Sequence, residues 1–312
     1  MNEDKLKNNS SIQKDTLSIF QIAVMTTICV ASLRTLPPMA EEGRASILMY
    51  IIPAILFLIP TSLVSAEFAT TYKGGIYVWI REAFGNRMGF VAIWLQWIQN
   101  VVWYPVQLAF VAAALAFTIN RGDLSNSGLF TAVVIIVVYW FSTFLAFKGG
   151  NLFAKVSSIG GMIGVLIPGA ILIILGLLWI AQGQPISESY LQSSYIPKIT
   201  GISSLVLIVS NVLSYAGMEM NAVHAGQMEN PKKDFTKAIA LAFILILCVF
   251  VFPTLAIAIA IPADKLGMAN GIMVAFQEFF EKLNISWMSN VMSGAMFFGA
   301  IASVVTWVAG PS

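Results

Sequence analysis

Four polar side chains that could do chemistry lie inside otherwise apolar stretches of this sequence: Arg34, Glu219, Asn221 and His224. A guanidinium can bind a carboxylate through two parallel hydrogen bonds, which makes Arg34 a candidate anion contact. A carboxylate that loses its water is more stable when it is protonated, so Glu219 is a candidate proton-responsive group. Imidazole titrates near neutral pH, so His224 is a candidate pH switch.

Each of these residues also has a plain structural interpretation, and the sequence leaves both open. Arg34 could bind a substrate carboxylate, could take the place of a bound cation, or could extend to the outer surface and pair with Glu41 or Glu42. Glu219 could accept hydrogen bonds from unwound backbone without ever titrating. His224 is the single histidine, and a histidine near a helix end is commonly structural.

The polar residues coincide with two places where a helical pattern is interrupted. Pro37 and Pro38 lack backbone donors and restrict the residue before them, so the first apolar run should unwind over 32–36. Gly217 and Gly226 loosen the run that carries Glu219. Proline kinks and glycine contacts are common in ordinary spanning helices. Two breaks at corresponding positions of two halves are instead typical of the substrate site of a secondary transporter.

The composition requires the apolar runs of this sequence to cross a membrane. Of the 312 residues, 58% are hydrophobic and 10% are charged, and the mean hydropathy is +0.83. This excludes a disordered chain, a nucleic-acid-binding protein and an ordinary cytosolic enzyme. A helix needs about 20 apolar residues to span a bilayer. The runs that reach this length are 17–38, 47–70, 88–118, 129–147, 152–181, 201–225, 236–261 and 288–310.

Basic residues indicate the orientation of these eight predicted spans. The segment 1–16 and the loops after the second, fourth and sixth runs hold eleven Lys and Arg, and the other loops hold six, which together make all 17. The positive-inside rule therefore predicts a cytoplasmic N-terminus. No ATP-binding, metal-ligand or hydrolase motif occurs in the sequence, so we expect no cofactor, no metal and no enzymatic activity.

The second and sixth runs resemble a known family. The stretches 66–69 (Ala-Glu-Phe-Ala), 74–79 (Gly-Gly-Ile-Tyr-Val-Trp) and 84–85 (Phe-Gly) resemble the signature of permeases in the amino acid–polyamine–organocation superfamily. The stretches 214–219 and 229–235 are similar to the same superfamily's broken sixth helix and the loop after it. The Ser-Tyr start of the break, His224 and the stretch 307–312 are most similar to the glutamate/gamma-aminobutyrate antiporter branch.

The resemblance implies an all-α membrane protein with a LeuT-like five-plus-five inverted repeat. The transporter domain would cover 17–310, with a first repeat at about 17–181 and a partial second repeat at about 201–310. Members of the family carry about four more helices, so we expect a fragment or a truncated product. The usual Gly-Ser-Gly break of the first helix is replaced here by 31–35 (Ala-Ser-Leu-Arg-Thr), which leaves the choice of substrate open.

The resemblance also implies where the substrate binds. It would lie between the two breaks, and Glu219 and His224 would couple transport to protons. The residues expected to bind substrate are Ala31, Ser32, Leu33, Arg34, Thr35, Tyr215, Ala216, Gly217 and Met218.

Two functions follow from this interpretation. The first is a secondary amino acid antiporter, or a proton-coupled amino acid permease, in a bacterial plasma membrane. The alternative is a non-transporting membrane sensor or scaffold, or an inactive remnant of a transporter. The expected partners are an amino acid, the lipid bilayer and a second copy of the chain, and no nucleic acid.

Overall fold

The computed structural model describes residues 17–72, 75–148, 159–197 and 201–309, and the regular structure in these ranges is helical throughout. The predicted cytoplasmic segment 1–16 and the predicted domain end at residue 310 lie outside the described residues. Within the described ranges, six helical stretches are long and apolar enough to cross a membrane, and a bent pair makes a seventh if it is counted as one span. They are Ala45–Thr71, Asn86–Thr118, Gly128–Phe147, Ile159–Ala181, Pro231–Ala260, Trp287–Val308 and the pair Ile19–Val30 with Leu33–Ala40.

The elements within these spans show where the chain departs from regular helix. The first span consists of α1 (Ile19–Val30), η2 (Leu33–Thr35) and α2 (Leu36–Ala40). The second consists of α3 (Ala45–Pro53), a π-helical turn η3 (Ala54–Leu58) and α4 (Ile59–Thr71). The others are α6 (Asn86–Thr118), α7 (Gly128–Lys148), η5 (Met162–Leu166) with α9 (Ile167–Ala181), α12 (Pro231–Ala260) and α14 (Trp287–Ala309).

The sixth predicted run, 201–225, is not a continuous helix. It contains α11 (Ile202–Ser214), seven residues of turns, and the 3₁₀-helix η6 (Ala222–Gln227). The break expected from Gly217 is therefore confirmed. The structure also contains short helices outside the spans that were not predicted, namely α5 (Ile76–Phe84), η4 (Gly122–Asn126), α10 (Glu188–Gln192), η7 (Ala263–Lys265) and α13 (Gly271–Lys282).

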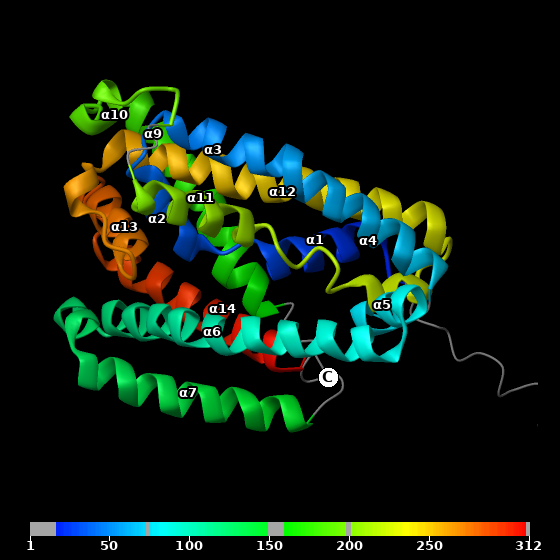
Figure 1. Ribbon diagram of the computed structural model, residues 1–312. Helices are drawn as coiled ribbons and strands as arrows, with labels where there is room; N and C mark the ends of the chain where they lie inside the picture. Colours follow the sequence, from blue (N-terminus) through cyan, green and yellow to red (C-terminus); the bar gives the residue numbers. More distant parts are fainter. Residues whose placement is uncertain (1–16, 73–74, 149–158, 198–200, 310–312) are drawn as a thin grey trace, which may run out of the picture.

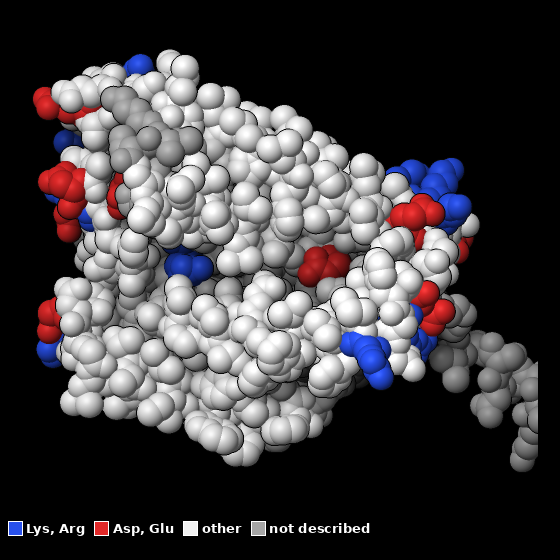
Figure 2. Space-filling view, viewed as in Figure 1, with Lys and Arg blue, Asp and Glu red and all other residues white. Residues whose placement is uncertain are grey.

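The spanning helices lie side by side, as Figure 1 shows, with α12 and α3 along one edge, α1 in the middle, and α6, α14 and α7 toward the other edge. The helices α10 and α13 lie at one end of this bundle and α5 lies at the opposite end. Most charged side chains gather at these two ends in Figure 2, and the broad band between them is uncharged apart from one basic and one acidic patch near its middle. This distribution fits a bilayer that surrounds the middle of the bundle.

Small residues allow the span that contains η5 to pack directly on α14. A Cβ atom on Gly164 would lie 2.3 Å from the Cα of Gly299, and one on Gly160 would lie 2.3 Å from the Cβ of Ala302. Beside them, a Cβ on Gly161 would lie 2.0 Å from a methyl group of Ile28 in α1. The glycines thus let this span approach the backbone of α14 and the side chain of Ile28 in α1, as small residues do in membrane helix packing.

The second half of the broken first span, and the turn after it, are held by α13 and by the segment that contains α10. Gly271 at the start of α13 packs on Pro37, since an added Cβ would lie 2.7 Å from the proline ring. Immediately after α2, the amide of Arg44 donates to Ser193 Oγ at 2.9 Å. The Arg44 guanidinium lies over the rings of Tyr190 and Tyr195, at 5.2 and 5.3 Å from their centroids. These contacts position the outer side of the break.

Candidate functional site

The first break begins where α1 stops. Ala31 and Ser32 adopt extended backbone angles, and a single 3₁₀ turn follows over Leu33–Thr35. The helix resumes at Leu36 with Pro37 and Pro38 in its first turn, where proline is tolerated because those amides need no helical partner. The axis bends by 45° across the break. The unwinding expected over 32–36 is therefore confirmed, shifted by one residue toward the N-terminus.

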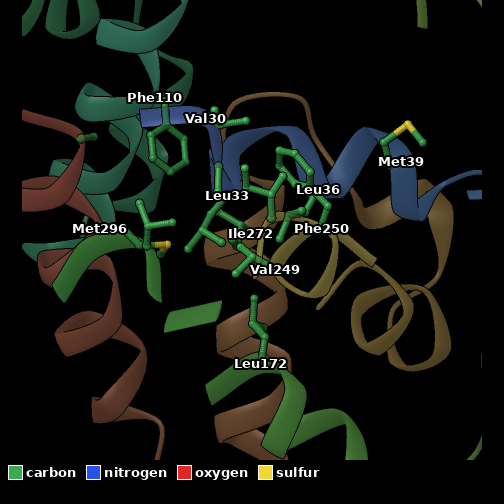
Figure 3. Packing of buried hydrophobic residues seen from close by; sticks show 14 of the residues in the cluster. Val30, Leu33, Leu36, Met39, Phe110, Leu172, Val249, Phe250, Ile272 and Met296 are labelled. Atoms are coloured by element: carbon green, nitrogen blue, oxygen red, sulfur yellow. The ribbon is translucent and has the colours of Figure 1, made fainter. Parts of the chain in front are cut away.

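The apolar side chains of this break pack into the core. Leu33 is buried, and its Cδ2 lies 3.6 Å from the position of a Cβ on Gly169. Figure 3 shows Leu33 and Leu36 directed toward Val249 of α12 and Ile272 of α13. These leucines anchor the break, so Leu33, although it was expected to bind substrate, contributes packing, and Ala31 is buried as well.

Arg34 is the polar exception in the first break. Its side chain is half-buried, and its Nε atom is buried without a hydrogen-bond partner among the described residues. Among the described residues it forms no ion pair, so the proposed pairing with Glu41 or Glu42 is not observed. Ser32 and Thr35 are also half-buried, and the Thr35 hydroxyl donates to the Ser32 carbonyl at 2.8 Å. The Arg34 guanidinium therefore carries a hydrogen-bond donor that no described residue satisfies.

The second break follows α11. The chain makes a series of turns after Ser214, and Gly217 has a φ of +115°, a conformation that residues with a side chain rarely adopt. The helix does not resume until the 3₁₀ turn at Ala222. The glycine that the sequence marked as a loosening point is thus the residue that lets the chain turn.

The two breaks meet at Gly217. A Cβ on this glycine would lie 3.5 Å from Val30 Cγ2, 3.6 Å from the Cys29 carbonyl oxygen and 3.7 Å from Trp307 Cζ2. Trp307 comes from α14, and its ring packs against Trp103 of α6 at 5.5 Å between centroids. Trp307 was not among the predicted site residues, because its position in the last predicted span gave no sign that its ring lies against Gly217.

Two helix C-termini point into this junction. Helix α1 ends at Val30 and α11 ends at Ser214, and the last carbonyl groups of a helix have no partner within it. Aligned peptide dipoles make a helix C-terminus equivalent to roughly half a negative charge. Glu219 lies five residues after the end of α11 and adds a carboxylate. The junction therefore favours a positively charged group such as an ammonium.

A buried hydrogen bond joins α1 to the turns of the second break. The Asn221 amide donates to Thr26 Oγ1 at 3.2 Å and lies 3.7 Å from Cys29 Sγ. Asn221 and Thr26 are both buried. Asn221 was recognised as a polar residue at membrane depth, whereas Thr26 was missed, because a threonine in an apolar helix usually bonds to its own backbone.

The hydroxyl group of Tyr215 forms a hydrogen bond with α3. The side chain is fully buried, its hydroxyl donates to the Tyr50 carbonyl at 3.0 Å, and its ring packs edge-on against Phe250. One turn earlier, the Asn211 amide donates to the Met49 carbonyl. This carbonyl lacks its helical donor because residue 53, four positions on, is a proline. Tyr215 and Asn211 therefore join the end of α11 to α3.

Replacing Tyr215 with phenylalanine should lower the free energy of unfolding by about 1 kcal/mol, since the variant loses one buried hydrogen bond and keeps the ring. The measurement is thermal unfolding of the purified chain in detergent micelles. Tyr72→Phe is the matched control, because Tyr72 is exposed and its hydroxyl has no partner among the described residues. Equal stability of the two variants would show that the Tyr215 hydroxyl has no structural role.

The remaining predicted residues differ in exposure. Met218 is fully buried, whereas Ala216 and Glu219 are half-buried. Among the described residues Glu219 forms no ion pair. His224 lies in η6, which packs on α4, and its Nδ1 atom is buried with no hydrogen-bond partner in the part of the chain that the structure describes. Within the described part of the chain, no group of three or more His, Cys, Asp or Glu residues could hold a metal ion.

Known proteins are similar to this chain along nearly its whole length. The sequence is 40% identical over 301 residues to an uncharacterized transporter, lpg1691, of Legionella pneumophila, and the match covers 96% of this chain and 64% of that protein. It is 29% identical to a glutamate/gamma-aminobutyrate antiporter of Lactococcus lactis, with 95% of this chain and 60% of the antiporter covered. A probable agmatine/putrescine antiporter, AguD, of the same species is 27% identical, with 95% and 63% covered.

The chain thus spans about three fifths of the length of these relatives. The sequence profile of the amino acid permease family matches residues 16–312. The resemblance found in the second and sixth runs is confirmed by these matches, and so is the expectation of a transporter family rather than an enzyme. The chain belongs to the amino acid permease family and is a multi-pass, all-helical membrane protein of the LeuT fold.

Proposed function

We propose that this chain carries the substrate site of a secondary amino acid transporter that works by exchange or by proton coupling. The observation that supports this most directly is the meeting of the two breaks at Gly217, between the C-termini of α1 and α11. The partial negative charge of these two helix C-termini suits the ammonium group of a substrate. Arg34, on the outer side of the first break, has the geometry to bind the carboxylate.

The relatives narrow the class of substrate. Two similar antiporters are named for glutamate with gamma-aminobutyrate and for agmatine with putrescine. All four compounds carry an amine, which the junction of helix C-termini would attract. The unpartnered guanidinium of Arg34 favours a substrate that also carries a carboxylate. We therefore propose that the substrate is an amino acid rather than an amine without a carboxylate.

The proposed setting is the inner membrane of a bacterium, with a cytoplasmic N-terminus, as the bias of basic residues predicts. Similar proteins include an inner membrane transporter, YjeM, of Escherichia coli. We infer that residues 17–181 and 201–310 correspond to a first repeat and part of a second, since the breaks lie in the first helix of each.

Counterflow in liposomes tests the function. The purified chain is reconstituted into vesicles loaded with unlabelled glutamate, gamma-aminobutyrate or agmatine, and uptake of the same labelled compound is followed. Accumulation above that of protein-free vesicles supports transport, and a preference for the two amino acids supports the role of Arg34. A monodisperse, folded chain that neither binds nor exchanges any of them would favour the non-transporting sensor or remnant.

Glu219→Gln should make exchange independent of pH, because the amide fixes the side chain in a neutral state while the carboxylate changes charge as it binds a proton. The initial rate of counterflow is measured between about pH 5 and 8 in steps, for both proteins. Glu281→Gln is the control, since Glu281 is an exposed carboxylate of α13 without an ion pair among the described residues. If the Glu219 variant keeps the pH profile of the parent, another group responds to protons.

A further inference from the structure

Three lysines mark the beginning of the longest apolar span after the second break. Lys232, Lys233 and Lys237 lie in the first two turns of α12 (Pro231–Ala260), and all three are exposed. Figure 2 shows positively charged side chains gathered at the end of the bundle where α12 begins in Figure 1. None of the three forms an ion pair with a carboxylate within the described ranges.

Two of these lysines lie in line with an exposed apolar stripe of the same helix. Lys233, Lys237, Ala240 and Ile244 follow one another at spacings of four, three and four residues, which places them on one helical face, and all are exposed. Ile244 is 55% exposed. At 1.5 Å per residue, it lies about 10 Å deeper along the axis than Lys237. A lysine at this position can lay its stem on apolar surface and extend its ammonium to the headgroup level.

The carboxylates near the lysines do not neutralise them by contact. Asp234 uses a side-chain oxygen to accept the Asn230 amide at 3.2 Å at the start of the helix. Glu229 precedes the helix, and Glu67 lies on the exposed side of the adjacent α4, but neither forms an ion pair with a described lysine. The ammonium groups are therefore free to bind an anion at the membrane surface.

We propose that the lysine face of α12, formed by Lys232, Lys233 and Lys237, binds the headgroup of an anionic phospholipid whose acyl chains lie along Ala240 and Ile244. A lysine near an anionic surface contributes about fivefold to binding. A soluble anion would gain from the charges alone, whereas a lipid gains from the charges and from the apolar stripe below them. The proposal rests on the bilayer position proposed above but not on transport activity.

The test measures lipid binding to the purified chain in neutral detergent, by native mass spectrometry and by the shift in thermal unfolding temperature. Phosphatidylglycerol is compared with phosphatidylcholine, and glycerol phosphate is the soluble anion. The triple variant Lys232→Gln, Lys233→Gln, Lys237→Gln should bind phosphatidylglycerol about tenfold or more weakly. The matched triple variant with arginine at the same positions should bind it as the parent does.

Lys282→Gln is a second control, since it removes one exposed lysine from α13 at the other end of the bundle. Lys237→Gln alone should weaken binding about fivefold and covers the case of a triple variant that does not fold. Unchanged binding of phosphatidylglycerol to a folded glutamine variant would overturn the proposal. Equal binding of phosphatidylcholine by the parent would also overturn it. Displacement of the lipid by glycerol phosphate would show that the charges act without the apolar stripe.

Discussion

Replacing Gly164 with valine should prevent the chain from folding into a stable bundle, and Gly164→Ala should already cost about 3 kcal/mol. A Cβ at this position would lie 2.3 Å from the Cα of Gly299 and 2.9 Å from the Ala295 carbonyl oxygen. These are backbone atoms of α14, so no side chain can rotate away to make room. The two helices would have to separate, and with them the contacts of Gly160 with Ala302.

The consequence reaches the site because α14 also carries Trp307, whose ring lies against Gly217. Unfolding temperature and elution as a single species in detergent report the effect. Gly128→Ala is the matched control, because a Cβ there would meet no atom within 4 Å. The reciprocal change Gly299→Ala should be as harmful as Gly164→Ala. Wild-type stability in either variant would show that the two helices do not pack in backbone contact.

Much of this architecture could be predicted from the sequence, because membrane spans obey a simple rule of length and hydropathy. Seven of the eight apolar runs become spans, and the remaining run contains the predicted break at Gly217. The first break was also predictable, since two prolines fix where a helix can restart. The helices α5, α10 and α13 were missed because they lie outside the apolar runs and are too short for such a rule.

The site was predicted less completely, because residues of one break can face different ways. Leu33 points into the core while its neighbour Arg34 is half-buried with an unpartnered nitrogen. The Tyr215 hydroxyl binds the Tyr50 carbonyl of α3, which could not be known without the position of α3 relative to α11. Trp307 comes from a span without a break, and Thr26 lies in the regular helix α1 before the first break. Tertiary packing alone brings them to Gly217 and Asn221.

Arg34→Gln should lower the affinity for an amino acid about 100-fold. The affinity for the matching amine, which is the same compound without its carboxylate, should stay almost unchanged. A charged hydrogen-bonded contact contributes about 1.5–3 kcal/mol, and the bidentate contact of a guanidinium with a carboxylate lies at the upper end of that range. An amine without the carboxylate never makes this contact. The two ligands are therefore expected to differ in affinity for the parent chain and to become nearly equal in the variant.

The pair of ligands separates a direct contact from a general disturbance of the break. Competition of each unlabelled ligand against the labelled amino acid gives the four dissociation constants, with Lys282→Gln as a control that removes a distant positive charge. Equal losses for both ligands would mean that Arg34 supports the shape of the first break, in agreement with its buried Nε atom. A selective loss for the amino acid would assign the guanidinium to the carboxylate. The Arg34→Lys variant refines this assignment, because an ammonium keeps the charge but cannot make the bidentate contact, and it should recover only part of the affinity.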